Sequence, residues 1–273
     1  MIALKKSILT LPQSQISFRR KNVKRLSIVV IAVMLGSMVL AACGGAASPT
    51  KIKIGTDATF PPFELVDEKT KELTGFDVEL MKAVAQKAGL DVEFTNVGFD
   101  PLLAGIAQCQ YDGGIAAITI TDDRKKQMLF SDPYFSAGQV VVVQKNNDAI
   151  KSKDDLGGKT VGSQIGTTGA IEVGKIAGAK LKTYDSFDLA FQDLINGQID
   201  AVIADNPLAL GYIGKNADKI KVVGPVFTSE SYGIALCNKK TDLADKLNKG
   251  IAAVKADGTL DKLTQKWIVG SGQ

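Results

Sequence analysis

Short apolar runs typical of strands alternate with longer amphipathic stretches typical of helices from residue 51 to residue 256. Apolar residues recur with helical spacing in the segments 77–88, 101–108, 167–177, 187–196, 209–216 and 241–256. Strand patterns occupy 51–56, 92–94, 114–117, 139–144, 160–163, 201–204, 221–223 and 233–236. Parallel strands need a long crossover, which a helix usually supplies. The alternation therefore predicts an α/β protein with mainly parallel sheets flanked by helices.

The part of the chain from residue 51 onward, roughly 220 residues, suits either one domain or two lobes. With 45% hydrophobic and 23% charged residues, the chain has the composition of an ordinary folded protein. The alternation by itself does not decide between the two arrangements.

The N-terminal residues have the charge pattern of an export signal. An apolar run at 26–42 follows seven basic residues, with no acidic residue before its end: Lys5, Lys6, Arg19, Arg20, Lys21, Lys24 and Arg25. The run is at the short limit for a membrane-spanning helix and ends at small residues rather than at a charged cluster. We therefore expect residues 1–42 to be cleaved as a signal peptide.

The four residues Leu40-Ala41-Ala42-Cys43 resemble the bacterial lipobox. That resemblance implies a lipid-modified Cys43 at the new N-terminus, with residues 43–50 as a lipidated tether. Two or three acyl chains would hold such a protein on a membrane, as a single chain would not. The alternative is a plain secretory signal with an incidental cysteine.

Charge and composition restrict the other classes of function. Cleavage after residue 42 would remove seven of the 33 basic residues and none of the 29 acidic ones, so the formal net charge would change from +4 to about −3. No basic stripe with interleaved aromatic residues follows, so we expect no nucleic-acid partner. The chain has no histidine, and no cofactor and no metal site are expected.

Two further cysteines, Cys109 and Cys237, stand far apart in the chain. An exported protein can oxidise such a pair to a disulfide bridge. Two buried free thiols are the ordinary alternative, and the sequence favours this second reading.

Three sequence blocks resemble the polar amino-acid-binding proteins of ATP-driven importers. The first is Gly-Thr-Asp-Ala-Thr-Phe-Pro-Pro-Phe-Glu at 55–64, followed by Gly-Phe-Asp-Val-Glu-Leu at 75–80. The second is Ile-Thr-Ile-Thr-Asp-Asp-Arg-Lys at 118–125 with Phe-Ser-Asp-Pro-Tyr at 130–134. The third is Asp-Ala-Val-Ile-Ala-Asp-Asn-Pro at 200–207, with Trp267 near the end. Together they cover almost the whole chain after the tether.

The resemblance implies a two-lobed, hinged periplasmic-binding-protein fold of type II. Lobe 1 would be discontinuous, formed by residues 51–137 and 232–273, and lobe 2 would be residues 138–231. The chain would cross between the lobes near 136–140 and 230–233. We expect such a protein to act as a monomer.

The resemblance assigns Arg124 to the ligand carboxylate and Asp205 to its ammonium group. A guanidinium suits the first task because it can make two parallel hydrogen bonds to a carboxylate. Arg124 could instead form a surface ion pair with Asp122 or Asp123. Asp205 could instead cap the helix that begins before Pro207.

The remaining site residues implied by the resemblance fall into two groups. Ala117, Thr119, Thr167 and Thr168 would complete the carboxylate anchor through backbone N–H groups and hydroxyls. The side-chain pocket would be lined by Asp57, Phe60, Phe99 and Gln164. Phe60 and Phe99 could instead be ordinary core residues, and Asp57 could cap a local turn.

The sequence departs from glutamine-binding relatives at two positions. Gln164 replaces a lysine and Ala204 replaces a histidine found in some of them. Arginine or glutamine is the expected ligand, with lysine or a broader polar set still open.

The expected partners are a free polar amino acid, the permease subunits of an importer, and a membrane reached through the anchor. The location would be the periplasm or the outer face of the cell membrane. Two other functions fit the same scaffold. One is an enzyme such as a small-carboxylate dehydratase, for which Asp57 and Glu64 could supply acid or base; the other is a ligand-sensing domain.

Overall fold

A computed structural model describes residues 50–270 of the chain. The predicted signal peptide at 1–42, Cys43 and all but the last residue of the predicted tether lie outside the described residues. Within the described part, no helix is both long enough and apolar enough to span a membrane.

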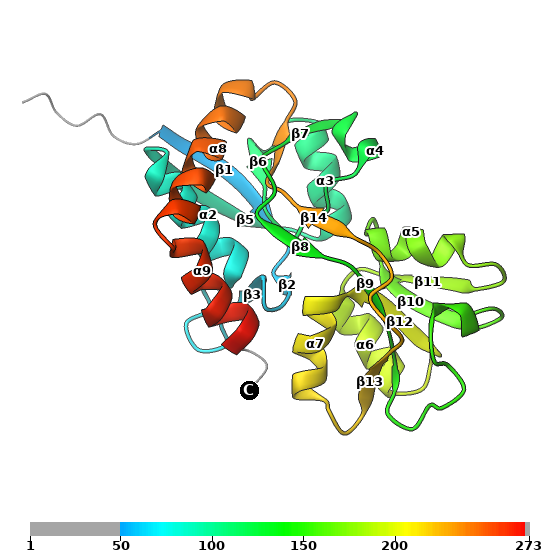
Figure 1. Ribbon diagram of the computed structural model, residues 1–273. Coiled ribbons are helices and arrows are strands. Elements are labelled where there is room, and N and C mark those ends of the chain that lie inside the picture. Colours follow the sequence, from blue (N-terminus) through cyan, green and yellow to red (C-terminus); the bar gives the residue numbers. More distant parts are fainter. Residues whose placement is uncertain (1–49, 271–273) are drawn as a thin grey trace, which may run out of the picture. The chain divides into compact units, whose positions relative to one another are not determined.

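The first of two five-stranded sheets draws its strands from both ends of the described chain (Figure 1). In the order β5-β1-β6-β15-β7, its strands are Leu90–Asn96, Thr50–Thr56, Gly113–Gly114, Ala235–Cys237 and Met128–Phe130. Its helices are α2 at Phe76–Lys87, α3 at Phe99–Ala107 and α8 at Thr241–Ala256.

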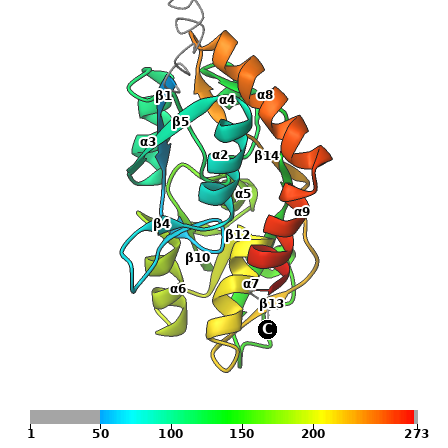
Figure 2. The same ribbon diagram turned by 90° about the vertical axis from the view of Figure 1, so that its left-hand side faces the viewer.

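The helices of the first sheet cover both of its faces. Ile52 and Ile54 of β1 share a core with Leu80 of α2 and Leu247 of α8. A separate core holds the apolar side of α3 against the other face. In Figure 2, α8 and the short α9 at Thr259–Thr264 follow one another along α2.

The second sheet lies entirely within the middle of the chain. In the order β11-β10-β12-β9-β13, its strands are Lys180–Tyr184, Thr160–Gln164, Ala201–Asp205, Gln139–Gln144 and Ile220–Val223. Its helices are α5 at Thr168–Lys175, α6 at Phe187–Ile195 and α7 at Asn206–Lys215. Successive strand residues face opposite sides, so Val140 and Val142 join the core with α6 and α7, whereas Val141 and Val143 join the core with α5.

Both sheets are mainly parallel, as the sequence predicts. In each sheet four strands point the same way and one runs opposite: β15 in the first and β9 in the second. These two strands are reached from a connecting strand rather than through a helical crossover, which explains their direction. Three of the predicted site residues stand at the carboxyl ends of strands: Asp57 follows β1, Gln164 ends β10 and Asp205 ends β12.

Two strands connect the sheets and pair with each other. β8 at Phe135–Ala137 precedes β9, and β14 at Glu230–Tyr232 precedes β15. Their antiparallel pairing makes a two-stranded ribbon, which overlaps the segments predicted as crossings. The exact lobe limits given above stay a prediction.

The shorter elements complete the described chain. They are β2 at Thr59–Phe60, β3 at Glu64–Val66, β4 at Leu73–Thr74, α4 at Asp122–Lys125, the 3-10 turn η3 at Lys153–Asp155 and the π-helical turn η4 at Gln265–Val269. Strand patterns predict neither β7 nor β11. Of the predicted strand at 114–117, only Gly114 lies in a strand, β6, and Ala117 adopts a left-handed backbone with φ of 46°.

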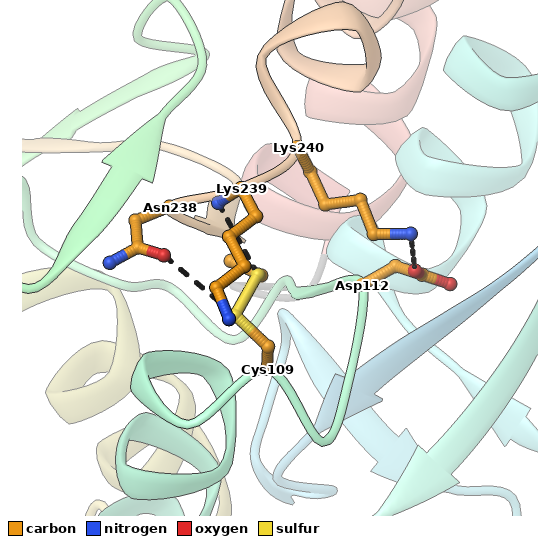
Figure 3. Close-up of a disulfide and its surroundings, with 6 residues drawn as sticks. Cys109, Asp112, Asn238, Lys239 and Lys240 are labelled. Atoms are coloured by element: carbon orange, nitrogen blue, oxygen red, sulfur yellow. Dashed lines mark hydrogen bonds and ion pairs between the residues drawn. A yellow bond between two sulfur atoms is a disulfide. The ribbon is translucent and has the colours of Figure 1, made fainter.

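Cys109 and Cys237 form a disulfide bridge, so the expectation of two free thiols is wrong (Figure 3). The two residues are 128 positions apart and their Cα atoms are 4.9 Å apart. Nearby, the Lys240 ammonium pairs with Asp112 at 2.7 Å. The pairing of β6 with β15 brings the two cysteines together, although local sequence gives no sign of that proximity.

Candidate ligand-binding site

Eight of the ten residues predicted to bind the ligand line one small cavity beside the carboxyl ends of the strands. The wall consists of Phe60, Phe99, Ala116, Ala117, Thr119, Arg124, Thr167, Thr168 and Asp205. Ala116 is the single addition to the predicted set. Asp57 and Gln164 are not part of this wall, although Phe99 joins the cavity to Asp57 through a backbone hydrogen bond.

Arg124 is buried and does not form the surface ion pair considered above. Its guanidinium donates to the Thr119 carbonyl at 2.7 Å and to the Gly166 carbonyl at 3.0 Å. Only 9% of the residue is exposed, and burial lowers the pKa of the guanidinium to about 10, opposed by the negative charges of Asp205 and Glu230. Arg124 therefore stays charged at neutral pH.

The aspartates beside Arg124 pair with lysines instead. Asp122 lies 3.6 Å from Lys125, and Asp123 lies 2.7 Å from Lys126. The cap of this short helix is Thr121, whose hydroxyl accepts from the Arg124 backbone N–H. Arg124 is the buried residue of this four-residue helix.

Asp205 ends β12 and precedes the first residue of α7, and its side chain caps no helix N–H group. Its carboxylate instead accepts a hydrogen bond of 2.8 Å from the Tyr232 hydroxyl. Burial, and then the negative charge of Glu230, raise its pKa to about 7, against hydrogen bonds that lower it. A ligand ammonium group would favour the ionised form of this carboxylate.

A hydrogen bond links Asp57 to Gln164 beyond the cavity wall. The Gln164 amide donates to Asp57 at 2.7 Å and to the Asp185 carbonyl at 2.9 Å. The other carboxylate oxygen of Asp57 accepts from Thr59, so Asp57 also has the local turn role considered above. Burial raises the pKa of Asp57 despite these hydrogen bonds.

Phe60 and Phe99 are both buried core residues and cavity residues. The Phe60 ring lies 5.6 Å from the ring of Phe187 on α6, so it packs between the two sheets. The Arg124 guanidinium lies 5.3 Å from the centre of the Phe99 ring. Phe99 thus contacts the predicted cation of the site directly.

The segment that carries Ala117 and Thr119 is held by a buried carboxylate. Asp77 accepts from the Ala117 backbone N–H and from the Tyr134 hydroxyl, each at 2.7 Å. The left-handed conformation of Ala117 directs its N–H group to Asp77, which is fully buried. The Ala117 N–H group is therefore committed within the protein and cannot also donate to a ligand.

Thr167 and Thr168 stand at the start of α5 and face the cavity. The Thr167 hydroxyl caps the helix by accepting from the Ala170 N–H group at 3.3 Å. The positive end of this helix is a favourable place for an anion. The hydroxyls of Thr119 and Thr168, however, donate to Glu230 rather than into the cavity.

Sequence reasoning did not identify the polar residues behind the wall. Glu230, Gln139 and Tyr232 are buried and form hydrogen bonds with residues of the predicted site. The sequence does place an amide, Gln139, and a carboxylate, Glu230, inside the two segments predicted to cross between the lobes. Polar residues at such positions could have indicated a role near the site. No group of three metal-ligating side chains occurs within residues 50–270.

Two α/β units joined by a two-stranded ribbon, with a buried cation and a buried anion on one cavity, are typical of two-lobed solute-binding proteins. The chain belongs to the bacterial extracellular solute-binding proteins, family 3, whose model matches residues 52–270.

Relatives with similar sequences and similar solved structures agree with this assignment. The chain is 35% identical over 245 residues to ABC transporter arginine-binding protein 1 of Escherichia coli (strain K12), covering 88% of this chain and 98% of that protein. It is 46% identical, with a TM-score of 0.77, to an ancestral arginine-binding protein bound to arginine, covering 81% and 99% of the two chains. It is 47% identical, with a TM-score of 0.77, to an ancestral arginine-binding protein bound to glutamine, covering 82% of this chain and 98% of that one.

Proposed function

We propose that the protein captures a free polar amino acid outside the cytoplasm and delivers it to the permease of an ATP-driven importer. The observation that carries the proposal is the position of Arg124 and Asp205 on the wall of one cavity. A free amino acid has a carboxylate and an ammonium group at a fixed separation. Its recognition from water requires a cation and an anion placed to match.

The carboxylate would bind between Arg124 and the start of α5. A guanidinium has five N–H donors, and Arg124 uses two of its guanidinium nitrogens to bind the Thr119 and Gly166 carbonyls, so other N–H groups can reach a ligand. The backbone N–H groups of the first turn of α5, beginning at Thr168, add hydrogen-bond donors that are fixed in place by the helix. This arrangement favours an anion at that end of the cavity.

The opposite end of the site favours a cationic side chain, so we assign arginine before glutamine. Asp57 supplies an anionic acceptor, and the Gln164 side-chain oxygen is buried without a hydrogen-bond partner. A guanidinium is rich in donors and has no acceptor, whereas the glutamine amide has both. The names of the arginine-binding relatives agree with this order.

Delivery would depend on closure of the two lobes. Arg124 and Thr119 follow strands of the first sheet. Asp205 ends a strand of the second sheet, and Thr168 begins a helix that follows another of its strands. A ligand that contacts both sets gains interactions only in the closed form, and this differential affinity shifts the equilibrium toward closure. The lobe limits proposed for this motion are 51–137 with 232–273, and 138–231.

The protein would be held at the membrane through Cys43 and act as a monomer. The proposed anchor rests on the N-terminal sequence, with its basic residues, apolar run and lipobox-like Leu40-Ala41-Ala42-Cys43. The anchor would keep the binding lobes on the extracytoplasmic side, beside the permease. Mass spectrometry of the intact protein from membranes would show an N-terminal acylated cysteine, and an unmodified Cys43 would contradict the anchor.

The protein would not act as an enzyme on its ligand. Asp57 and Glu64 were the candidate acid and base, but Asp57 is held by Gln164 and Thr59, and Glu64 is completely buried. Neither stands beside Arg124 and Asp205 on the cavity wall, where the carboxylate and ammonium groups of the ligand would bind. Catalysis on a small carboxylate would require an acid or base positioned at that end of the ligand, whereas Asp57 would contact only its side chain.

Calorimetry of the purified protein against the twenty amino acids tests this proposal. We expect a saturable heat with a stoichiometry of about one for arginine, weaker heat for glutamine, and recovery of the ligand unchanged. No saturable heat with any amino acid would overturn the function. Conversion of the ligand, followed by chromatography of the same samples, would instead support an enzyme.

A further inference from the structure

Glu230 is a buried carboxylate at the junction of the two sheets, outside the set of residues predicted to bind the ligand. It begins β14 in the ribbon that connects the sheets, and 9% of it is exposed. Four side chains donate hydrogen bonds to it, over distances of 2.7–3.1 Å: Thr119, Gln139, Thr168 and Thr228. The four groups that donate to this carboxylate are all neutral hydroxyls or an amide.

One oxygen of this carboxylate joins the two lobes. Glu230 Oε2 accepts from the Thr119 hydroxyl at 2.7 Å and from the Thr168 hydroxyl at 2.9 Å. Thr119 follows β6 of the first sheet, and Thr168 begins α5 after β10 of the second sheet. The two hydroxyl oxygens are only 3.5 Å apart. Separation of the lobes must break at least one of these two hydrogen bonds.

We propose that Glu230 is a positioning residue for lobe closure, holding Thr119 and Thr168 together so that the two halves of the ligand carboxylate site stay assembled. The proposal rests on the proposed function and adds to it the residue that retains the ligand. Glu230 acts through the two threonines and would not contact the amino acid. Because hydrogen bonds to charged groups are stronger than those between neutral groups, a carboxylate suits this task better than an amide.

The other charged groups around Glu230 provide an independent readout. Arg124 and Asp205 both interact with it electrostatically, and its negative charge contributes to the raised pKa of Asp205. Removal of this charge should therefore lower the pKa of Asp205. A residue with a purely structural role, without a charge near Asp205, would not move that value.

The experiment measures arginine binding to the Glu230→Gln variant, which keeps the side-chain shape but removes the charge. At about pH 8.5, where Asp205 is largely ionised in both proteins, stopped-flow measurements should show arginine dissociating roughly tenfold faster, with association changed less than threefold. The pH at which arginine affinity falls should also shift downward in the variant.

Glu172→Gln is the matched control. Glu172 lies on α5 and lines the same large surface groove as Glu230, but its carboxylate pairs with exposed Lys175 at 2.6 Å. We expect wild-type dissociation rates and an unchanged pH profile. A change as large as that of Glu230→Gln would contradict the proposal, because it would show that charge anywhere in the groove is sufficient.

A second substitution keeps the proposal testable if Glu230→Gln does not fold. Thr168→Val removes the hydroxyl with little change in shape, and Thr168→Ser retains it. The valine variant should release arginine faster, and the serine variant should restore slow release. In the Glu230→Gln background, Thr168→Val should add little, because the same interaction is already weakened.

The outcomes separate this inference from the proposed function. Arginine dissociation within twofold of wild type in folded Glu230→Gln, or fully additive effects of the two substitutions, would overturn the role of Glu230 alone. Failure of the wild-type protein to bind any amino acid would overturn the proposed function itself.

Discussion

The Gln164 amide donates to the Asp57 carboxylate over 2.7 Å, joining the last residue of β10 to the residue that follows β1. Gln164 belongs to the second sheet and Asp57 directly follows a strand of the first, so this hydrogen bond connects the two α/β units. It also leaves the Gln164 oxygen as a buried, unpartnered acceptor beside an anion. The pair is therefore suited to receive a donor-rich cationic side chain.

Asp57→Asn should weaken arginine binding far more than glutamine binding. Loss of the charge removes the charge-assisted hydrogen bond to a guanidinium, a change of roughly 10- to 100-fold in affinity, whereas a neutral amide loses less than about fivefold. Calorimetric titration with both amino acids measures the difference. Asp148→Asn is the control, since Asp148 makes an exposed ion pair with Lys221. Equal losses for the two ligands would contradict the arginine assignment.

Arginine affinity should fall as the pH falls through about 7. Asp205 must be ionised to hold an ammonium group, and its pKa is raised to about 7 by burial and by the charge of Glu230. Between pH 7 and pH 5.5 the affinity should fall roughly tenfold. Titrations at several pH values measure the slope, and Asp205→Asn should bind weakly with little pH dependence. A flat wild-type profile would show that Asp205 does not contact the ammonium.

The folding stability of the ligand-free protein should decrease as the pH rises through about 7, whereas ordinary acid denaturation makes a protein less stable as the pH falls. Burial raises the pKa of Asp77 to about 7 and that of neighbouring Glu64 well above its ordinary value. The folded protein therefore holds these protons more tightly than the unfolded chain, so stability present in mild acid is lost as the pH rises through about 7.

Thermal melts from about pH 5 to pH 8 test this expectation. The melting temperature of the ligand-free protein should decrease by several degrees as the pH rises. Glu64→Gln should reduce the decrease, because one of the two carboxyls no longer ionises. A melting temperature that rises steadily over this range in both proteins would contradict the protonated pair.

Loss of the disulfide should lower stability without changing ligand selectivity. The bridge joins Cys109 to Cys237, 128 positions apart, and so closes a loop that contains the whole second sheet. Replacing both cysteines by serine should lower the free energy of unfolding by about 2–4 kcal/mol, measured by denaturant titration. The ratio of arginine to glutamine affinity should stay the same, since neither cysteine lines the cavity. A changed ratio would show that the bridge positions the site.

The fold follows from the sequence wherever periodicity and packing agree. The helix at Thr241–Ala256 and the strand at Gln139–Gln144 have the predicted limits, because regular apolar spacing matches a buried face in both. The strand Lys180–Tyr184 was missed, since it is an edge strand with mostly exposed residues and little apolar pattern. Ala117 was placed in a strand, and only the contact with Asp77 explains its left-handed backbone.

In the candidate site, too, local motifs predicted some residues, whereas others depend on contacts between distant parts of the chain. Arg124 and Asp205 could be named from motifs, and their burial on one cavity is what the resemblance implies. The role of Glu230 could not be named, because it depends on two threonines that the chain brings together from positions 119 and 168. The disulfide likewise depends on the pairing of β6 with β15, a long-range contact that local sequence does not reveal.

Arginine titration of Arg124→Ala tests the central claim most directly. The account predicts that the folded variant gives no saturable heat, because the ligand carboxylate would lose its buried counter-charge, while Lys125→Ala, which removes the exposed neighbouring cation, binds like wild type. Wild-type arginine affinity in folded Arg124→Ala would contradict the account.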